Sequence, residues 1–203
     1  MLSIDDLVIT KFKKAGRGSL FFTEDFTRFG SAKAVSKALE RLVDKGEISR
    51  VARGIYTRQK NDPIIGTIKP GAEDIAEAIR RRDKSRIMPT GTQALNALGL
   101  STQVTMNVVF LTDGAARKIS VGKHKIVFKK TSTKNLATIG KISSLAIQAM
   151  KEIGKDHITE NQIEIILKQL AMEDPKRLEH DIKLAPEWIR IILRKALKPH
   201  VND

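Results

Sequence analysis

The first sixty residues alternate between two spacings of apolar side chains. Over residues 3–15 the apolar positions recur every three or four residues, which predicts an amphipathic helix that Ser3 can cap. Residues 20–22 form a short apolar run that is typical of a strand, and Thr23 can cap a short helix after it. We therefore expect a helix, a strand and a second helix, in that order, before Gly30.

A longer helix and a hairpin follow. Gly30 ends the short helix, and Ser31 is a good N-cap for the next one. The apolar stripe of that helix consists of Val35, Ala38, Leu39, Leu42 and Val43. Gly46 suits the left-handed conformation that ends a helix, and residues 48–51 and 55–57 are predicted to be the two strands of the hairpin. This order predicts an N-terminal winged helix-turn-helix, a fold that binds duplex DNA.

Basic and hydroxyl side chains coincide with the two elements of this fold that contact DNA. A recognition helix reads base edges near its N-terminal end, and a wing contacts phosphates or the minor groove. The candidate DNA-binding residues are Ser31, Lys33, Ser36, Lys37, Arg41, Arg50 and Arg53. The alternative is an ordinary solvated face, but the cations fall on both DNA-contacting elements. We therefore expect operator DNA, with inverted repeats, as the partner.

Proline and glycine punctuate residues 61–71, which predicts a domain boundary. We expect a winged-helix domain over residues 1–60 and a second domain over residues 61–203. The second domain is predicted to be mixed over residues 61–130 and helical over residues 131–203. The expected fold class is therefore α+β, with a winged helix, a small mixed unit and a helical C-terminal region.

The apolar spacing also predicts the elements of the second domain. In the mixed part we expect helices over 72–82 and 92–98, a loop over 88–91, and an antiparallel meander of strands at 108–111, 118–121 and 125–128. In the helical part, three apolar stripes predict helices that end before Gly154, Pro175 and Pro199.

The charge is strongly positive and unevenly distributed. Lys and Arg number 37 against 23 Asp and Glu, a formal net charge of +14. Residues 1–60 carry 13 basic and 7 acidic side chains, whereas residues 131–203 carry 12 and 10. A positive field raises encounter rates with nucleic acids and makes their binding salt-dependent. Residues 61–130 carry 12 and 6, so the first two segments are equally positive, and the nearly balanced C-terminal third fits protein contacts or plain solvation better than a phosphate surface.

Other features of composition favour a cytoplasmic protein without a membrane segment. The chain has no cysteine, which is typical of a reducing compartment and excludes thiolate metal ligands. Asp5 and Asp6 near the start do not fit a signal peptide, and no run of 18 apolar residues is present.

No enzyme signature is found, so we expect a non-enzymatic protein without a metal or cofactor. Phosphate-binding loops of the Gly-x-x-x-x-Gly-Lys-Ser/Thr and Gly-x-Gly-x-x-Gly types are absent. The histidines have no metal-ligand spacing: His124, His157, His180 and His200. Gly30-Ser31 and Gly91-Thr92 resemble a nucleotidyltransferase element, but the carboxylate pair that would hold Mg²⁺ does not follow either site.

A polar string over residues 90–103 follows a run of arginines. Together they form a candidate anion-binding site: Arg80, Arg81, Arg82, Arg86, Thr90, Gln93 and Gln103. A helix N-terminus beside arginines favours an anion such as a nucleotide or an RNA phosphate. The alternative is a capped helix between two loops, after a helix whose basic end complements its dipole.

Three segments resemble the AbiEi-like antitoxins of bacterial abortive-infection toxin–antitoxin systems. They are the winged-helix string that ends in Arg53-Gly54-Ile55-Tyr56, residues 86–103 (RIMPTGTQALNALGLSTQ), and residues 110–114 (FLTDG). Together they span roughly residues 20–130, a little over half of the chain. The string at 86–103 is fairly specific, whereas the helical tail carries no matching motif.

The resemblance implies a two-part protein. Its winged helix would bind operator repeats and repress the system's own promoter. The remainder would counteract a nucleotidyltransferase toxin, as type IV antitoxins do, without necessarily forming a stable complex with it. The candidate anion site would then be the possible antitoxic site. Two alternatives stay open: a stand-alone winged-helix regulator, and an enzyme or RNA-binding protein that uses residues 80–103.

Overall fold

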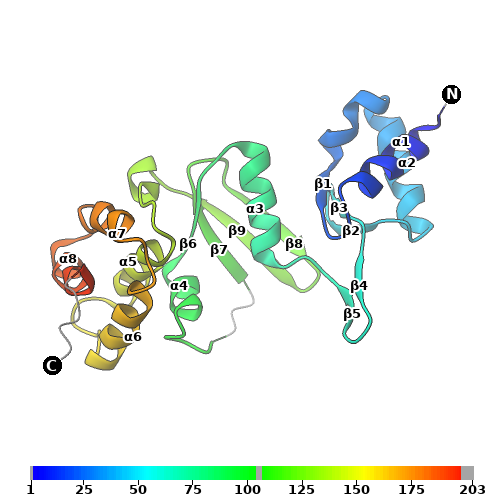
Figure 1. Cartoon of the computed structure of the whole chain (residues 1–203). Helices are drawn as coiled ribbons and strands as arrows, with labels where there is room; N and C mark the ends of the chain where they lie inside the picture. The colour runs from blue at the N-terminus through cyan, green and yellow to red at the C-terminus, as the bar shows by residue number, and fades with distance from the viewer. Residues whose placement is uncertain (1, 104–106, 198–203) are drawn as a thin grey trace. The chain divides into compact units, whose positions relative to one another are not determined.

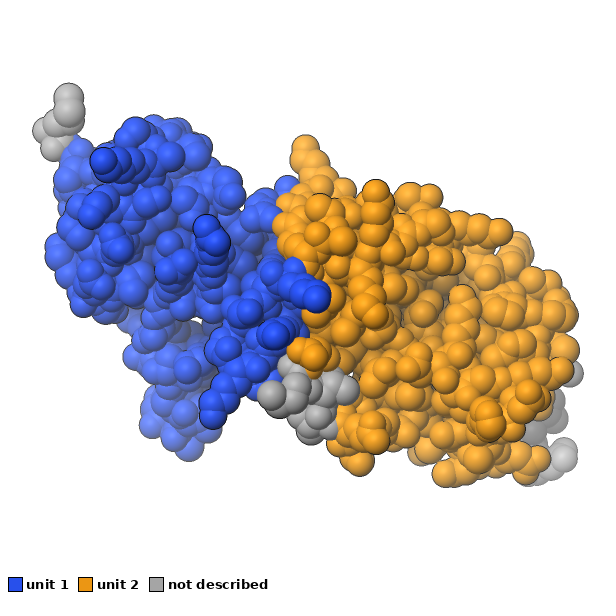
Figure 2. All heavy atoms as spheres, turned by 180° about the vertical axis from the view of Figure 1, so that it is seen from behind, with its two compact units in different colours: residues 1–82, 118–126 blue, residues 83–117, 127–203 orange. Residues whose placement is uncertain are grey.

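The computed structural model describes residues 2–103 and 107–197, and it shows a mixed α+β protein (Figure 1). The predicted helix end before Pro199, and His200, lie outside the described residues. The chain divides into two compact units (Figure 2). Unit 1 comprises Met1–Arg82 and Lys118–Ile126, and unit 2 comprises Asp83–Arg117 and Val127–Asp203. The predicted domain boundary after residue 60 stays a prediction.

Unit 1 begins with two helices, a 3-10 helix and a three-stranded sheet. In chain order these are α1 (Ile4–Lys14), β1 (Leu20–Phe22), η1 (Thr23–Phe29), α2 (Ala32–Asp44), β2 (Ser49–Ala52) and β3 (Ile55–Thr57). The sheet has the antiparallel order β1-β3-β2, with a bulge in β2 between Arg50 and Ala52. The predicted strand at residues 20–22 therefore does pair with the predicted hairpin.

Local signals explain the ends of these elements. Ser3 and Asp6 form a reciprocal capping box at α1, and Ser31 caps α2 through the backbone N–H of Ala34 at 3.3 Å. Gly46 follows α2 with a φ of 71°, as predicted. One cap was predicted incorrectly. Thr23 is the first residue of η1, and its neighbour Phe22 donates its backbone N–H to Asp25 Oδ2 at 2.7 Å.

Aromatic rings fill the core between α1, η1, α2 and the sheet. Phe12 and Phe26 are fully buried and stacked with 5.4 Å between ring centroids, and Phe21 meets Phe12 edge-on at 4.6 Å. The apolar stripe of α2 packs on them: Val35, Leu39 and Leu42. Tyr56 of β3, the single tyrosine of the chain, is partly buried against the same cluster.

Residues 60–83 form a hairpin and a helix. The hairpin consists of β4 (Lys60–Asp62) and β5 (Gly66–Ile68), and α3 spans Ala72–Asp83. The helix was predicted, but the hairpin was not. Of the residues that indicated a boundary, Pro63 lies in the turn between the two paired strands and Gly66 is the first residue of β5.

A second sheet corrects the predicted meander. Its strands are β6 (Ile87–Pro89), β7 (Asn107–Thr112), β8 (Arg117–Val121) and β9 (His124–Lys130). Their order is β6-β7-β9-β8, so β9 lies between β7 and β8. The predicted loop at residues 88–91 contains most of β6, which pairs antiparallel with β7 from Ile87 to Pro89. β6 is a three-residue edge strand, and Pro89 is tolerated at an edge, so the strand leaves little sequence signal.

Helices form most of unit 2. They are α4 (Gly91–Ala97), η2 (Thr133–Leu136), α5 (Lys141–Ile153), α6 (Glu160–Leu170), α7 (Pro175–Ile182), α8 (Glu187–Leu193) and η3 (Arg194–Leu197). Helices α4 to α8 share one core, on which Trp188, the single tryptophan, packs. The short α7 was not predicted. Pro175 does follow α6, but it also starts α7 at the first helical position behind the Asp174 cap.

Candidate nucleic-acid interface

The first half of α2 presents a cationic surface. Lys33, Ser36 and Lys37 are exposed, and their spacing places them on one side of the helix. The same side continues through Glu40 and Asp44, where the sign of the charge reverses. Positive charge is therefore concentrated at the N-terminal half of α2, the half that reads base edges in a recognition helix.

The N-terminal end of α2 keeps its positive partial charge. Ser31 satisfies the backbone N–H of Ala34 with a neutral hydroxyl, and the first turn of α2 has no acidic residue. The backbone carbonyl of Ser31 accepts the N–H of Val35 at 2.9 Å. Ser31 is thus a helix cap whose hydroxyl proton is still available to an acceptor such as a phosphate.

Arg41 is bound to a carboxylate of α1. Its Nη2 lies 2.6 Å from Asp5 Oδ1, and its Nε lies 3.0 Å from Asp5 Oδ2. The hydrogen bond from Arg41 holds the pKa of Asp5 below its ordinary range, because it stabilises the ionised carboxylate. Arg41 therefore joins α2 to α1, and the pair has no net charge.

The β2–β3 hairpin carries the other two predicted cations. Arg50 lies on β2 and Arg53 in the turn, and both are exposed. Gly54 completes the turn with a φ of 73°, and its carbonyl accepts the N–H of Thr23 at 3.1 Å, so the turn is held against the start of η1. Within residues 2–103 and 107–197, no carboxylate is paired with Arg50, Arg53, Lys33 or Lys37.

Two further clefts in unit 1 meet at Arg17, and sequence reasoning did not identify them. One, of about 400 Å³, is lined by Arg17, Lys60, Lys69 and Arg81 together with Asp74 and Glu77. The other, of about 260 Å³, is lined by Arg17, Lys45 and Arg58 together with Glu47. These residues lie on β4, on α3 and in the segments that connect elements, so no sequence motif joins them.

Each arginine of the predicted anion site contacts a side chain of the compact unit to which it belongs. Arg80 forms two hydrogen bonds of 2.7 Å to Glu77, and Arg81 lies 3.8 Å from the same carboxylate. The guanidinium of Arg82 stacks on Phe22 at 4.1 Å from the ring centroid. These three belong to unit 1.

Arg86, Thr90, Gln93 and Gln103 belong to unit 2. Arg86 Nε lies 3.3 Å from Asp113. The start of α4 is already occupied by a carboxylate, because Thr92 Oγ1 donates to Glu152 at 3.0 Å. A Cβ on Gly91 would lie 2.5 Å from Glu152 Oε2. The predicted anion site stays a prediction, and this geometry does not favour it.

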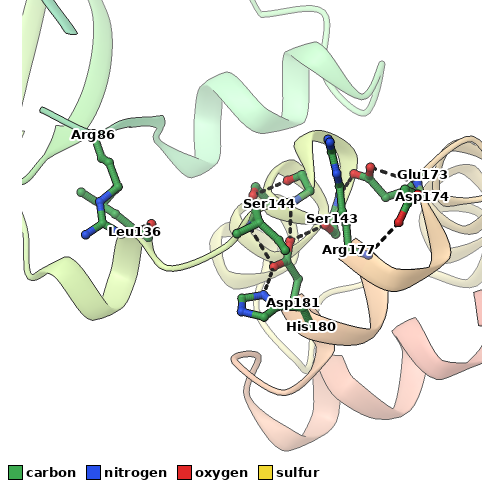
Figure 3. A network of polar contacts seen from close by, with 11 residues as sticks. Arg86, Leu136, Ser143, Ser144, Glu173, Asp174, Arg177, His180 and Asp181 are labelled. Atoms are coloured by element: carbon green, nitrogen blue, oxygen red, sulfur yellow. Dashed lines mark hydrogen bonds and ion pairs between the residues drawn. The ribbon is translucent and has the colours of Figure 1, made fainter. Parts of the chain in front are cut away.

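Sequence reasoning also missed a buried network at the start of α5 (Figure 3). Asp181 of α7 is fully buried and accepts the backbone N–H groups of Ile139 at 2.9 Å and Gly140 at 2.8 Å. It also accepts the hydroxyl of Ser143 at 2.6 Å, and His180 Nδ1 lies 2.8 Å away. The signal in the sequence was weak: Asp181 adjoins Ile182 and lies three residues after Leu178, on the buried side of α7.

Glu173 completes this network from the α6–α7 connection (Figure 3). Its Oε2 accepts the backbone N–H groups of Ile142 at 2.6 Å and Ser143 at 3.2 Å. A Cβ on Gly140 would lie 2.7 Å from the same oxygen and closer still to Ser143 Oγ, so glycine is required there for close approach. Two carboxylates of the fold thus occupy the positive end of α5.

Residues 7–178 match a family described as a family of unknown function, DUF6088. The chain belongs to this family. No curated protein matches the sequence. The DUF6088 match runs across both compact units, so the cationic half of α2 and the α5 network lie within one family segment. It has no bearing on the resemblance to AbiEi-like antitoxins.

Two features are absent from the described residues of this DUF6088 protein. No described helix combines the length and the apolar character needed to span a membrane. No group of three or more His, Asp or Glu side chains in those residues could hold a metal ion. That the protein is not an enzyme and uses no cofactor stays a prediction.

Proposed function

We propose that the N-terminal part of unit 1 is a winged helix-turn-helix that binds operator DNA, and that the protein is a transcriptional regulator. Three features support this proposal. The elements follow the order helix, strand, 3-10 helix, helix and hairpin. The strand after α1 pairs with the hairpin. The exposed cations lie on α2 and on the β2–β3 hairpin, the elements that serve as recognition helix and wing.

The observation that carries the proposal is the N-terminal half of α2. Lys33 and Lys37 are exposed, have no carboxylate partner among the described residues, and lie beside a helix end capped only by a neutral hydroxyl. Cations and a positive helix end on one surface favour phosphate oxygens. On an ordinary solvated surface, acidic and basic side chains would be expected along the whole helix. In α2 the acidic side chains and the ion-paired Arg41 lie in the second half only.

Mobility shifts with the full chain test the proposal. Duplexes that cover the region upstream of its own reading frame should be bound, with an affinity that falls steeply as salt rises. The variant Lys33→Ala/Lys37→Ala should bind at least about tenfold more weakly. Lys168→Ala, which removes an exposed cation of α6 in unit 2, is the matched control and should bind like the wild type. Equal binding by all three proteins, or tighter binding to duplex RNA, would overturn the assignment.

A second function, antitoxic activity, is favoured by one observation in unit 2. The two strings that resemble AbiEi-like antitoxins, residues 86–103 and 110–114, lie side by side as β6–α4 and the end of β7. They pair from Ile87↔Thr112 to Pro89↔Phe110. We propose that this surface counteracts a nucleotidyltransferase toxin, while the winged helix represses the promoter of the same operon.

Growth rescue tests the antitoxic role separately from DNA binding. The toxin candidate is a nucleotidyltransferase encoded by a neighbouring reading frame. Co-expression of the full chain should restore growth against it. The Lys33→Ala/Lys37→Ala variant should protect equally well, because those side chains belong to the other unit. Failure of the wild type to protect would leave a stand-alone regulator, and failure of the variant alone would show that protection requires DNA binding.

A further inference from the structure

The β4–β5 hairpin of unit 1 is a short, well-defined finger (Figure 1). Its strands pair antiparallel, Asn61 opposite Thr67 and Asp62 opposite Gly66. Asp62 Oδ1 accepts the backbone N–H groups of Ile64 at 2.9 Å and Ile65 at 3.1 Å. Gly66 has a φ of 76°. These are the features of a three-residue hairpin loop, in which an aspartate starts the turn and a left-handed glycine ends it.

The geometry of the turn does not require large apolar side chains at its two tip positions. Asp62, Pro63 and Gly66 suit their positions in the turn. Ile64 and Ile65 are 93% and 74% exposed, respectively, and they are the two most exposed large apolar side chains among the described residues. A single exposed isoleucine is ordinary, but an adjacent pair at the end of a finger presents apolar surface to a partner.

The base of the hairpin is anchored and cationic. Gly18 donates its backbone N–H to the carbonyl of Arg58 at 2.8 Å, and Arg17 Nη1 donates to the carbonyl of Gln59 at 3.2 Å. Arg17 thereby lies between the two clefts described above. The basic side chains that line these clefts are Arg17, Lys45, Arg58, Lys60, Lys69 and Arg81.

The acidic side chains around the base are partly neutralised. Glu77 is paired with Arg80 and Arg81, whereas Glu47 and Asp74, which accepts the backbone N–H of Gly71 at 2.9 Å, keep their charge, so the six basic side chains still outnumber the acidic ones. Asp62 is the single acidic residue of the hairpin, and its carboxylate serves the turn. The hairpin thus has an apolar tip and basic side chains where it joins unit 1. Proteins that insert an apolar wedge into the minor groove have this arrangement, and their basic side chains contact the flanking phosphates.

We propose that the β4–β5 hairpin inserts into the minor groove of DNA, where Ile64 and Ile65 enter between base pairs and kink the duplex. The cations at its base contact the phosphates on either side of the insertion. This proposal rests on the DNA-binding function proposed above. The hairpin would add a contact to DNA that reads the deformability of the duplex, separate from the contact with base edges proposed for α2.

Charge complementarity favours DNA over a protein partner at this tip. A second copy of the chain would bring the same basic residues against themselves, because a twofold interface places like surfaces together. Repulsion between the basic side chains of the two copies would oppose such a dimer. The phosphates of a DNA duplex would instead neutralise the basic side chains beside the hairpin.

Bending of a labelled duplex tests the proposal with the full chain. The probe is a duplex of about 30 base pairs, or three helical turns, from the upstream region, with donor and acceptor dyes at its ends. Wild-type protein should shorten the distance between the ends. Ile64→Ala/Ile65→Ala should abolish this shortening and weaken binding about fivefold to tenfold. The control is Met172→Ala, which removes another exposed large apolar side chain (68%) in unit 2 and should bend and bind like the wild type.

Each result separates this proposal from the function on which it rests. Absence of wild-type binding to the duplex would reject the DNA-binding function itself. Wild-type binding with equal bending by the alanine variant would reject the wedge alone. Loss of dimerisation by the alanine variant, measured by sedimentation of the free proteins, would instead assign the isoleucine pair to a contact between copies and overturn the proposal.

Discussion

Helices α2 and α5 both have thirteen residues, and neither has an acidic residue in its first turn, yet their N-terminal ends have opposite surroundings. The end of α2 is capped by the hydroxyl of Ser31 and carries the exposed Lys33. The N-terminal end of α5, where Gly140 is the N-cap residue, receives two carboxylates, Asp181 and Glu173, from outside the helix.

This difference shows which helix end is available to an external anion. At α5 the backbone N–H groups are satisfied within the fold, and side chains cover them from solvent. At α2 the positive partial charge remains beside cations that have no internal partner. A basic composition alone does not make this distinction, because it depends on where the carboxylates of the same chain are placed.

The largest expected effect is the loss of stability caused by a substitution at the N-terminal end of α5. Asp181→Ala should lower the free energy of unfolding by about 3 kcal/mol, because it leaves the buried N–H of Gly140, the partly buried N–H of Ile139 and the buried Ser143 hydroxyl without an acceptor. Urea unfolding followed by circular dichroism measures the change. Glu179→Ala, an exposed position on the same helix, is the control and should stay within about 0.5 kcal/mol of the wild type. A loss for Asp181→Ala no larger than the control's would show that the network is not needed for stability.

A smaller effect should distinguish the cations of α2 from one another. Lys37→Ala should weaken DNA binding about fivefold and reduce the salt slope by about one, as expected for a lost phosphate contact. The double variant Asp5→Asn/Arg41→Gln removes an ion pair without changing net charge, so it should bind DNA like the wild type. Titrations at several salt concentrations compare the two. If both variants lost the same amount of DNA affinity, Arg41 would be a DNA-contacting residue, as the sequence predicted.

The smallest effect concerns pH. The pKa of Asp5 is lowered in the folded protein, so its pairing with Arg41 stabilises the fold fully above the unfolded pKa of about 3.9 and is lost as pH falls through the lower folded pKa. Asp5→Asn should therefore melt slightly below the wild type at neutral pH, and the difference should vanish in strong acid. The difference should be small because Arg41 is 52% exposed. Melting curves from neutral pH into acid test this, and a gap that widens on acidification would contradict the sign.

Elements that depend on local signals were predicted well. The Ser3 and Ser31 caps, the left-handed Gly46 and the apolar stripe of α2 are encoded within a few residues of the features they determine. The apolar run at residues 20–22 likewise predicted the strand that the structure shows as β1.

Features that depend on distant residues were not predicted. Asp5 and Arg41 are 36 positions apart, and Asp181 reaches Gly140 across 41 positions, so no periodicity connects them. The position of β9 between β7 and β8 is likewise a choice of sheet order that strand spacing does not encode. The Pro and Gly residues near position 63 are equally compatible with a linker and a hairpin, and only the pairing of β4 with β5 distinguishes the two.

The placement of the two rare aromatic residues gives each compact unit its own optical probe. Tyr56, the single tyrosine, packs on the phenylalanine cluster of unit 1, and Trp188, the single tryptophan, packs on the helical core of unit 2. Intrinsic emission excited selectively at the indole therefore follows the unfolding of unit 2, while phenol emission follows unit 1. Coincident denaturation curves from the two probes would show that the units unfold as one cooperative system, and separate curves would give each unit its own stability.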